Sequence, residues 1–103
     1  MKKPLVLAAS AIVLLSLAAP VLAGPIESAC LRSDRKQATR QLCSCIQQVA
    51  DQTLQRSDQR KAAAFFRDPD RAQQVRMSDR DSDNAFWDRY RAFGDMAEVY
   101  CAS

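Results

Sequence analysis

The feature that most constrains this chain is a pair of cysteines one residue apart, Cys43-Ser44-Cys45, with one further cysteine on each side, Cys30 and Cys101. Four cysteines in a short exported chain are typical of a domain that two disulfide bridges hold together. On a helix, residues two positions apart lie about 200° apart around the axis, so Cys43 and Cys45 cannot bond each other there. We therefore expect each of them to bond a different distant cysteine.

Two pairings satisfy this expectation, Cys30–Cys43 with Cys45–Cys101 and Cys30–Cys45 with Cys43–Cys101. Cys101 lies near the centre of the apolar stripe of the last predicted helix, which indicates a partner close to the core. Cys43 is nearer than Cys45 to the apolar stripe of the helix that they share. The sequence therefore favours Cys30–Cys45 and Cys43–Cys101, in which Cys30 clamps the N-terminal segment across the outer flank of that helix. The other pairing stays open.

Residues 1–23 are predicted to be a cleavable signal peptide. Lys2 and Lys3 precede an uncharged apolar run over residues 5–17, and Val21-Leu22-Ala23 ends on a small residue, as signal peptidase requires. The run is too short to cross ~30 Å of hydrocarbon comfortably. We therefore expect cleavage after Ala23, no stable membrane insertion afterwards, and a periplasmic or secreted product.

Residues 24–103 are predicted to form one domain whose small core needs the disulfides. A core of about 80 residues is marginal, and each bridge contributes ~3 to 4 kcal/mol in the chain-entropy model. The whole chain has 15 basic and 12 acidic residues, and Lys2 and Lys3 belong to the leader, so the exported domain is nearly neutral. Lacking a clustered basic footprint, it is not expected to bind nucleic acid. The chain has no histidine, which excludes histidine metal sites and triads.

The fold class that the sequence predicts is all-α, a small domain of about four helices stapled by two disulfides. Hairpin turn signals and alternating apolar patterns are missing, while apolar residues recur every three or four positions. The predicted segments are a short helix over 26–31, a first main helix over 35–54, a short helix from Ser57 to the Arg67-Asp68-Pro69-Asp70 stretch, a helix over 69–77 and a last helix over 83–101. We interpret the four Ser-Asp dipeptides at 33, 57, 78 and 82 as helix starts.

Two apolar stripes are interpreted as the core. Spacings of three and four residues align the side chains in each stripe on one face of a helix. The first stripe comprises Leu42, Ile46, Val49, Ala50 and Thr53, and the aromatic-rich second comprises Phe86, Trp87, Tyr90, Phe93, Ala97 and Cys101.

A thiol–disulfide redox function of Cys43-Ser44-Cys45 is the main alternative to a structural role. A reactive thiol needs a lowered pKa, usually from a helix N-terminus or a nearby cation. Here the two cysteines fall in the middle of a predicted helix, and Cys30 and Cys101 offer each a structural partner. We therefore predict four structural cysteines and no catalytic residue, so that the protein is not an enzyme.

Metal and cofactor sites are not expected either. Met77 and Met96 would suit Cu(I) together with thiolates, but they form no cluster and oxidised cysteines are not ligands. Asp79, Asp81 and Asp83 resemble part of a calcium loop, but the segment lacks the glycine at the sixth position and the glutamate at the twelfth.

Binding of another periplasmic or envelope protein is the function that remains. Guanidinium groups grip carboxylates with two parallel hydrogen bonds. The middle helices have the weakest apolar faces, and we expect the contact surface there. Their arginines are Arg56, Arg60, Arg67, Arg71 and Arg76.

Three stretches resemble a group of small exported four-cysteine bacterial proteins, often labelled "arginine transporter". They are Gly24–Cys30 (GPIESAC), Cys43–Asp51 (CSCIQQVAD) and Phe86–Gly94 (FWDRYRAFG), which together extend over nearly the whole exported chain. The label implies an accessory role linked to arginine transport. A single short cleavable apolar segment cannot form a path through a membrane, so that role would belong to a soluble component. The resemblance implies no site residues.

Overall fold

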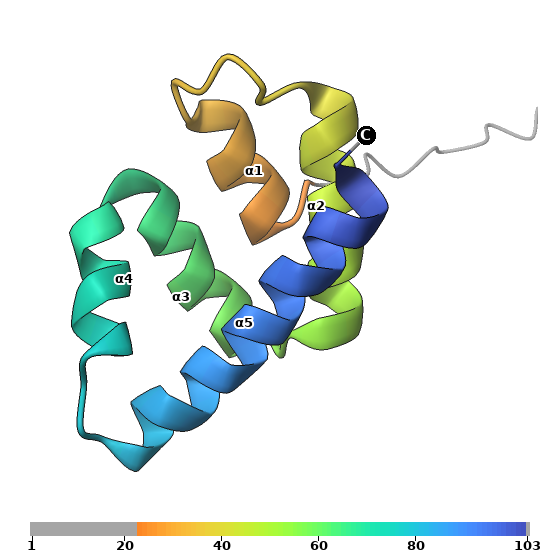
Figure 1. Cartoon of the computed structure of the whole chain (residues 1–103). Helices are drawn as coiled ribbons and strands as arrows, with labels where there is room; N and C mark the ends of the chain where they lie inside the picture. Colours follow the sequence, from red (N-terminus) through yellow and green to blue (C-terminus); the bar gives the residue numbers. More distant parts are fainter. Residues whose placement is uncertain (1–22, 103) are drawn as a thin grey trace, which may run out of the picture.

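The computed structural model describes residues 23–102, and within them every regular element is a helix (Figure 1). The predicted signal peptide lies outside the described residues except for Ala23. The predicted all-α class with two disulfides is confirmed. The helices are α1 (Pro25–Arg32), α2 (Arg40–Thr53), α3 (Arg56–Arg67), α4 (Pro69–Arg76) and α5 (Asp81–Cys101).

The long helix α5 packs against α2, α3 and α4 and joins the two ends of the fold (Figure 1). Its C-terminal end is bonded to α2 through Cys101, and its first turns are tied to α3 by an ion pair between Lys61 and Asp83. Helix α1 packs against both α2 and α3, while α4 packs against α3 and α5. Of the helices in residues 23–102, none is both long and apolar enough to cross a membrane.

The core lies where α1, α2, α3 and α5 meet, and it confirms the interpretation of the aromatic stripe. Tyr90 packs edge-on against Phe65 with ring centroids 5.3 Å apart, and Phe65 packs edge-on against Phe86 at 5.9 Å. Trp87, Tyr90, Ala97 and Cys101 border this core, and its buried members are Ile26, Val49, Ala50, Leu54, Ala62, Phe65, Phe86 and Phe93.

The first Ser-Asp dipeptide ends a helix and does not begin one. Ser33 is the C-terminal cap of α1, and both its N–H and its hydroxyl donate to the carbonyl oxygen of Cys30, at 3.1 and 2.6 Å. Helix α2 starts later than predicted, because the Thr39 hydroxyl accepts a hydrogen bond from the N–H of Leu42 at 3.1 Å. A side-chain cap of this kind fixes the first turn of a helix. Residues 34–39 therefore form a connection outside the helix.

The other three serines are not N-terminal caps of helices either. The N–H of Gln55 donates to Asp58 Oδ2 at 3.2 Å, so α3 begins before Ser57, which lies inside the helix. Ser82 also lies inside a helix, α5. Ser78 donates its hydroxyl to Asp83 Oδ2 at 2.7 Å and so binds the first turn of α5 from outside. In two of these dipeptides, the aspartates Asp58 and Asp83 accept the hydrogen bonds at the start of a helix.

The favoured disulfide pairing is wrong, because the bridges are Cys30–Cys43 and Cys45–Cys101. Helix α1 does not lie on an outer flank: Cys30 is 3 % exposed and faces Cys43, which is 0 % exposed. Cys101 is the last residue of α5 and only half-buried, at the edge of the core. The expectation that Cys43 and Cys45 bond different partners is confirmed, and α2 is thereby tied on both sides.

The two bridges should differ in their reaction with a reductant. Cys45 and Cys101 are half-buried, whereas Cys30 and Cys43 are almost fully enclosed. Because exchange requires a thiolate to reach a sulfur atom, native protein in dilute dithiothreitol should lose the Cys45–Cys101 bridge roughly tenfold faster or more. Alkylation with timed sampling and peptide mass mapping measures both rates. Equal rates, or earlier labelling of Cys30 and Cys43, would contradict the burial difference.

Candidate functional site

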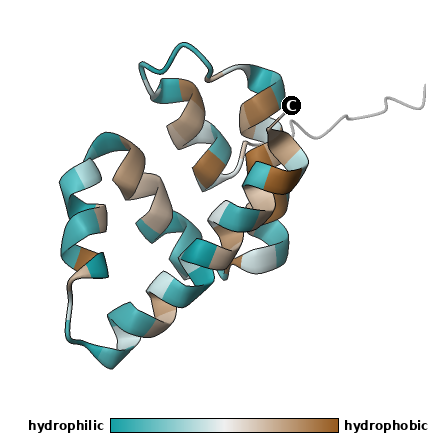
Figure 2. Cartoon of the chain, in the orientation of Figure 1, coloured by the Kyte–Doolittle hydropathy of each residue, from teal (hydrophilic) through white to brown (hydrophobic). Residues whose placement is uncertain are grey.

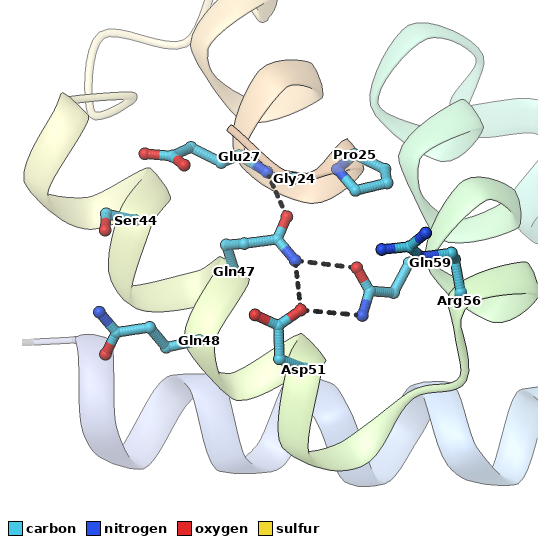
Figure 3. A pocket seen from close by; sticks show the side chains of 9 residues that line it. All are labelled: Gly24, Pro25, Glu27, Ser44, Gln47, Gln48, Asp51, Arg56 and Gln59. Carbon is cyan, nitrogen blue, oxygen red and sulfur yellow. Dashed lines mark hydrogen bonds between the residues drawn. The ribbon is translucent and has the colours of Figure 1, made fainter. Parts of the chain in front are cut away.

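Two hollows in the described surface carry side chains suited to binding. The first is a polar pocket of about 350 Å³ at the start of α1. The second, which we call the α3–α4 groove, has a volume of about 380 Å³. Figure 3 shows the first, whose lining residues are Gly24, Pro25, Glu27, Ser44, Gln47, Gln48, Asp51, Arg56 and Gln59.

The inner wall of the polar pocket is the carboxamide of Gln47, which is only 7 % exposed. Its Oε1 accepts hydrogen bonds from the backbone N–H groups of Ile26 and Glu27, both at 2.9 Å. Its Nε2 donates to Asp51 Oδ1 and to Gln59 Oε1, both at 2.8 Å (Figure 3). Every hydrogen-bonding site that such a buried amide must satisfy is therefore occupied.

Gln47 replaces a local N-terminal cap of α1. The N-cap residue is Gly24, which has no side chain to accept from the free N–H groups of the first turn. Gln59 completes the network by donating its Nε2 to Asp51 Oδ1 at 3.1 Å. Three helices thus meet at one amide group, and the wall of this pocket holds the fold together.

Gly24 is required at this position by close packing. A Cβ atom built on Gly24 would overlap the carboxamide of Gln47, whereas one built on Gly94 in α5 meets nothing within 4 Å. Gly24→Ala should therefore displace Gln47 and lower the free energy of unfolding by about 1 to 3 kcal/mol.

Gly94→Ala is the matched control for this substitution. It should stabilise the protein slightly, by about 0.5 to 1 kcal/mol, because glycine is unfavourable within a helix. Urea denaturation monitored by circular dichroism measures both values. Similar stability of the two variants would contradict the role assigned to Gln47.

The ion pairs found within the described residues join α3 to α5. Asp58, at the start of α3, accepts two hydrogen bonds from Arg89 of α5, at 2.8 and 2.9 Å. This guanidinium holds the pKa of Asp58 below its ordinary value, against the opposing effect of burial. The Ser78 hydroxyl and then Lys61 lower the pKa of Asp83, and Lys61 Nζ also lies 4.6 Å from the centre of the Phe86 ring.

The stability of the protein should therefore depend on Asp58 in acid. A carboxylate with a lowered pKa stabilises the folded state above its unfolded pKa, near 3.8, and this stabilisation disappears as the pH falls through the folded pKa. Asp58→Asn should cost about 1 to 2 kcal/mol near neutral pH. It should also flatten the loss of stability below about pH 4. Thermal melts across this range measure the effect.

Asp95→Asn, at an exposed position of α5, is the control for Asp58→Asn. Its melting temperature should follow that of the unmodified protein at each pH. A pH profile of Asp58→Asn parallel to that of the unmodified protein would show that the pair with Arg89 contributes nothing.

The α3–α4 groove has an apolar floor and basic edges. Phe65 is buried beneath it, and Ala64 and Val75 are half-buried beside it. Arg60 and Arg71 border it from different helices, and both are exposed. The full lining is Arg60, Lys61, Ala64, Phe65, Arg71, Gln74 and Val75, which includes no acidic residue.

The structure brings together two of the five arginines predicted at the contact surface. Arg60 and Arg71 border the groove, while Arg56 lines the polar pocket instead. Arg67 and Arg76 lie in the last turns of α3 and α4. All five are exposed, and the ion pairs found within residues 23–102 involve none of them.

Of the residues considered for redox and metal chemistry, Cys43, Cys45 and Asp83 are engaged elsewhere, while Met77 and Met96 are exposed, at the end of α4 and within α5. Cys43 and Cys45 are each bonded to a distant cysteine. Asp83 of the calcium-like fragment binds Lys61 and Ser78. Across the described part of the chain, there is no group of three or more side chains that could hold a metal ion.

Gln47 and Gln59 were not predicted to belong to a site. A signal was available for Gln47, because it lies four residues after Cys43 and three before Ala50, and both neighbours are buried. No such pattern marks Gln59.

The chain matches no protein-family model, no curated protein and no solved structure. Function is therefore inferred from the residues themselves.

Proposed function

We propose that this chain is a non-enzymatic binding protein of the cell envelope, periplasmic or secreted, that binds an acidic partner protein through the basic face of α3 and α4. We define this basic face as Arg60 and Arg71, the two of the five predicted arginines that the structure brings together at the groove. The observation that carries the proposal is the placement of Arg60 and Arg71, exposed and without ion pairs in the described chain, beside an apolar groove without carboxylates.

Free guanidinium groups suit recognition of carboxylates. Each can form two parallel hydrogen bonds with one carboxylate, and this geometry gives specificity as well as affinity. The cations that stabilise the fold are others, Arg89 and Lys61, so the basic face can be used for binding without loss of internal ion pairs. Because the exported domain is nearly neutral overall, the attraction is local to this face.

Helix α4 contributes more to the surface than to the core. None of its side chains is fully buried, and Figure 2 shows hydrophilic residues over most of its length. Its apolar residues Ala72 and Val75 are only partly covered. An exposed helix with a high content of arginine is consistent with a binding role.

The two alternatives have less support. Thiol–disulfide exchange through Cys43-Ser44-Cys45 gains none from the geometry, because the two cysteines are not bonded to each other and Cys43 is fully buried. A soluble role linked to arginine transport rests on the sequence resemblance alone. Export itself is supported by the predicted leader and by two disulfides, which persist in oxidising compartments.

Charge reversal on the basic face should abolish partner binding. Tagged Arg60→Glu/Arg71→Glu protein, expressed in the native host, should recover at least about tenfold less partner than unmodified protein, because each buried or bordering charge contact is worth ~1.4 kcal/mol or more. Quantitative mass spectrometry of periplasmic pull-downs measures recovery. Melting temperatures should agree within about 2 °C, because both positions are exposed.

Arg40→Glu/Arg91→Glu is the control, since it makes the same change in charge at exposed sites on α2 and α5. It should recover the partner normally. An equal loss of partner recovery in both variants would show that the net charge of the protein, and not the basic face, determines binding. Retention by Arg60→Glu/Arg71→Glu but loss by Val99→Glu would move the surface to the C-terminal half of α5, where Met96, Val99 and Tyr100 are exposed.

A further inference from the structure

The floor of the α3–α4 groove is preformed. Phe65 is held by edge-on contacts with Phe86 and Tyr90, at centroid distances of 5.9 and 5.3 Å, so its ring cannot move freely into the groove. Val75 of α4 packs against the same core from the other side. Ala64 has a short side chain and leaves space between the two helices. A rigid floor lowers the entropic cost of binding an apolar group.

The edges of the groove carry positive charge that is only partly neutralised. Lys61 is bound to Asp83 at 3.0 Å and lies over the Phe86 ring, so its charge is compensated and its position is fixed. Arg60 and Arg71 have no such partner in the described residues. The polar pocket differs, because Glu27 and Asp51 belong to its lining and would repel an anion.

The size of the groove limits what it can hold. About 380 Å³ is near the lower end of the range for small-molecule pockets, enough for one or two side chains. A folded surface reaches into such a space only through a protruding residue. The carboxylates that Arg60 and Arg71 would bind must then lie close to that residue along the same segment.

We propose that the α3–α4 groove binds a short linear acidic peptide segment, in which an aromatic or large aliphatic residue fills the groove and neighbouring Asp or Glu residues bind Arg60 and Arg71. This proposal rests on the proposed function and specifies the part of the partner that is recognised. The apolar residue supplies affinity through contact with Phe65 and Val75, and the carboxylates fix its orientation. Peptide recognition by arginines beside an apolar pocket needs no rearrangement of the helices.

Selection from a random phage-displayed peptide library tests the proposal. Unmodified protein should enrich sequences in which Asp or Glu lies within about three residues of Leu, Met, Phe or Trp. A fluorescent synthetic peptide of the enriched sequence is then titrated by fluorescence anisotropy. Replacing its acidic residues with Asn and Gln, or its apolar residue with Ala, should each weaken binding at least tenfold.

Two variants separate the groove from the charges around it. Ala64→Phe fills the groove and should weaken peptide binding at least tenfold. Ala92→Phe, which adds the same ring at an exposed position of α5 outside the groove, should leave binding unchanged within about twofold. Circular dichroism melts establish that both variants are folded, and Val75→Ser provides a second change in the floor if Ala64→Phe does not fold.

The results distinguish peptide binding in the groove from recognition of the partner by the basic face in general. Failure to enrich acidic–apolar sequences would overturn the groove proposal. Binding that survives Ala64→Phe and Val75→Ser but is lost in Arg60→Glu/Arg71→Glu would also overturn it, while leaving recognition by the basic face intact. A peptide that binds the groove without displacing the partner captured in pull-downs would show that the partner is recognised elsewhere.

Discussion

The carboxamide of Gln47 determines where α1 lies, and the rest of the fold depends on that placement. It accepts from two N–H groups at the start of α1 and donates to side chains of α2 and α3. With α1 held there, Ile26 fills the core and Cys30 reaches Cys43. A small domain cannot easily leave such a group unsatisfied, because each lost buried hydrogen bond costs about 1 to 3 kcal/mol. The same amide also requires glycine at position 24.

Local patterns in the sequence predicted the helices and the buried face of α5, but only part of the buried face of α2. Spacings of three and four residues identified each helical segment, and the aromatic stripe of α5 was placed correctly in the core. On α2, Val49 and Ala50 of the predicted stripe are buried as expected, but Cys43 and Gln47, which lie outside that stripe, are buried as well. Because Gln47 is polar, the spacing of apolar residues does not place it on the buried face. The disulfide pairing was mistaken for a different reason: Cys30 of α1 is buried against Cys43, whereas Cys101 lies only at the edge of the core.

The proposed binding surface could be predicted as a region but not as a set of neighbouring residues. Arginine content and a weak apolar face pointed to α3 and α4, since both are properties of single helices. Which arginines lie together depends on the angle between the helices, and that angle follows from the turn at Asp68 and from packing against α5. Arg56, although it belongs to α3 like Arg60, consequently lines a different hollow. The sequence therefore indicated which side chains could bind a carboxylate, but it did not indicate which of these side chains lie next to each other.

The bridge between Cys45 and Cys101 joins residues 56 positions apart and turns most of the domain into a covalent ring. Helices α3 and α4 and the connections around them all lie inside that ring. A single proteolytic cut between α4 and α5 would open the ring without releasing a fragment, since both pieces would stay joined through sulfur. The arginines of α3 and α4 thus lie on a segment that stays covalently attached to the domain after such a cut.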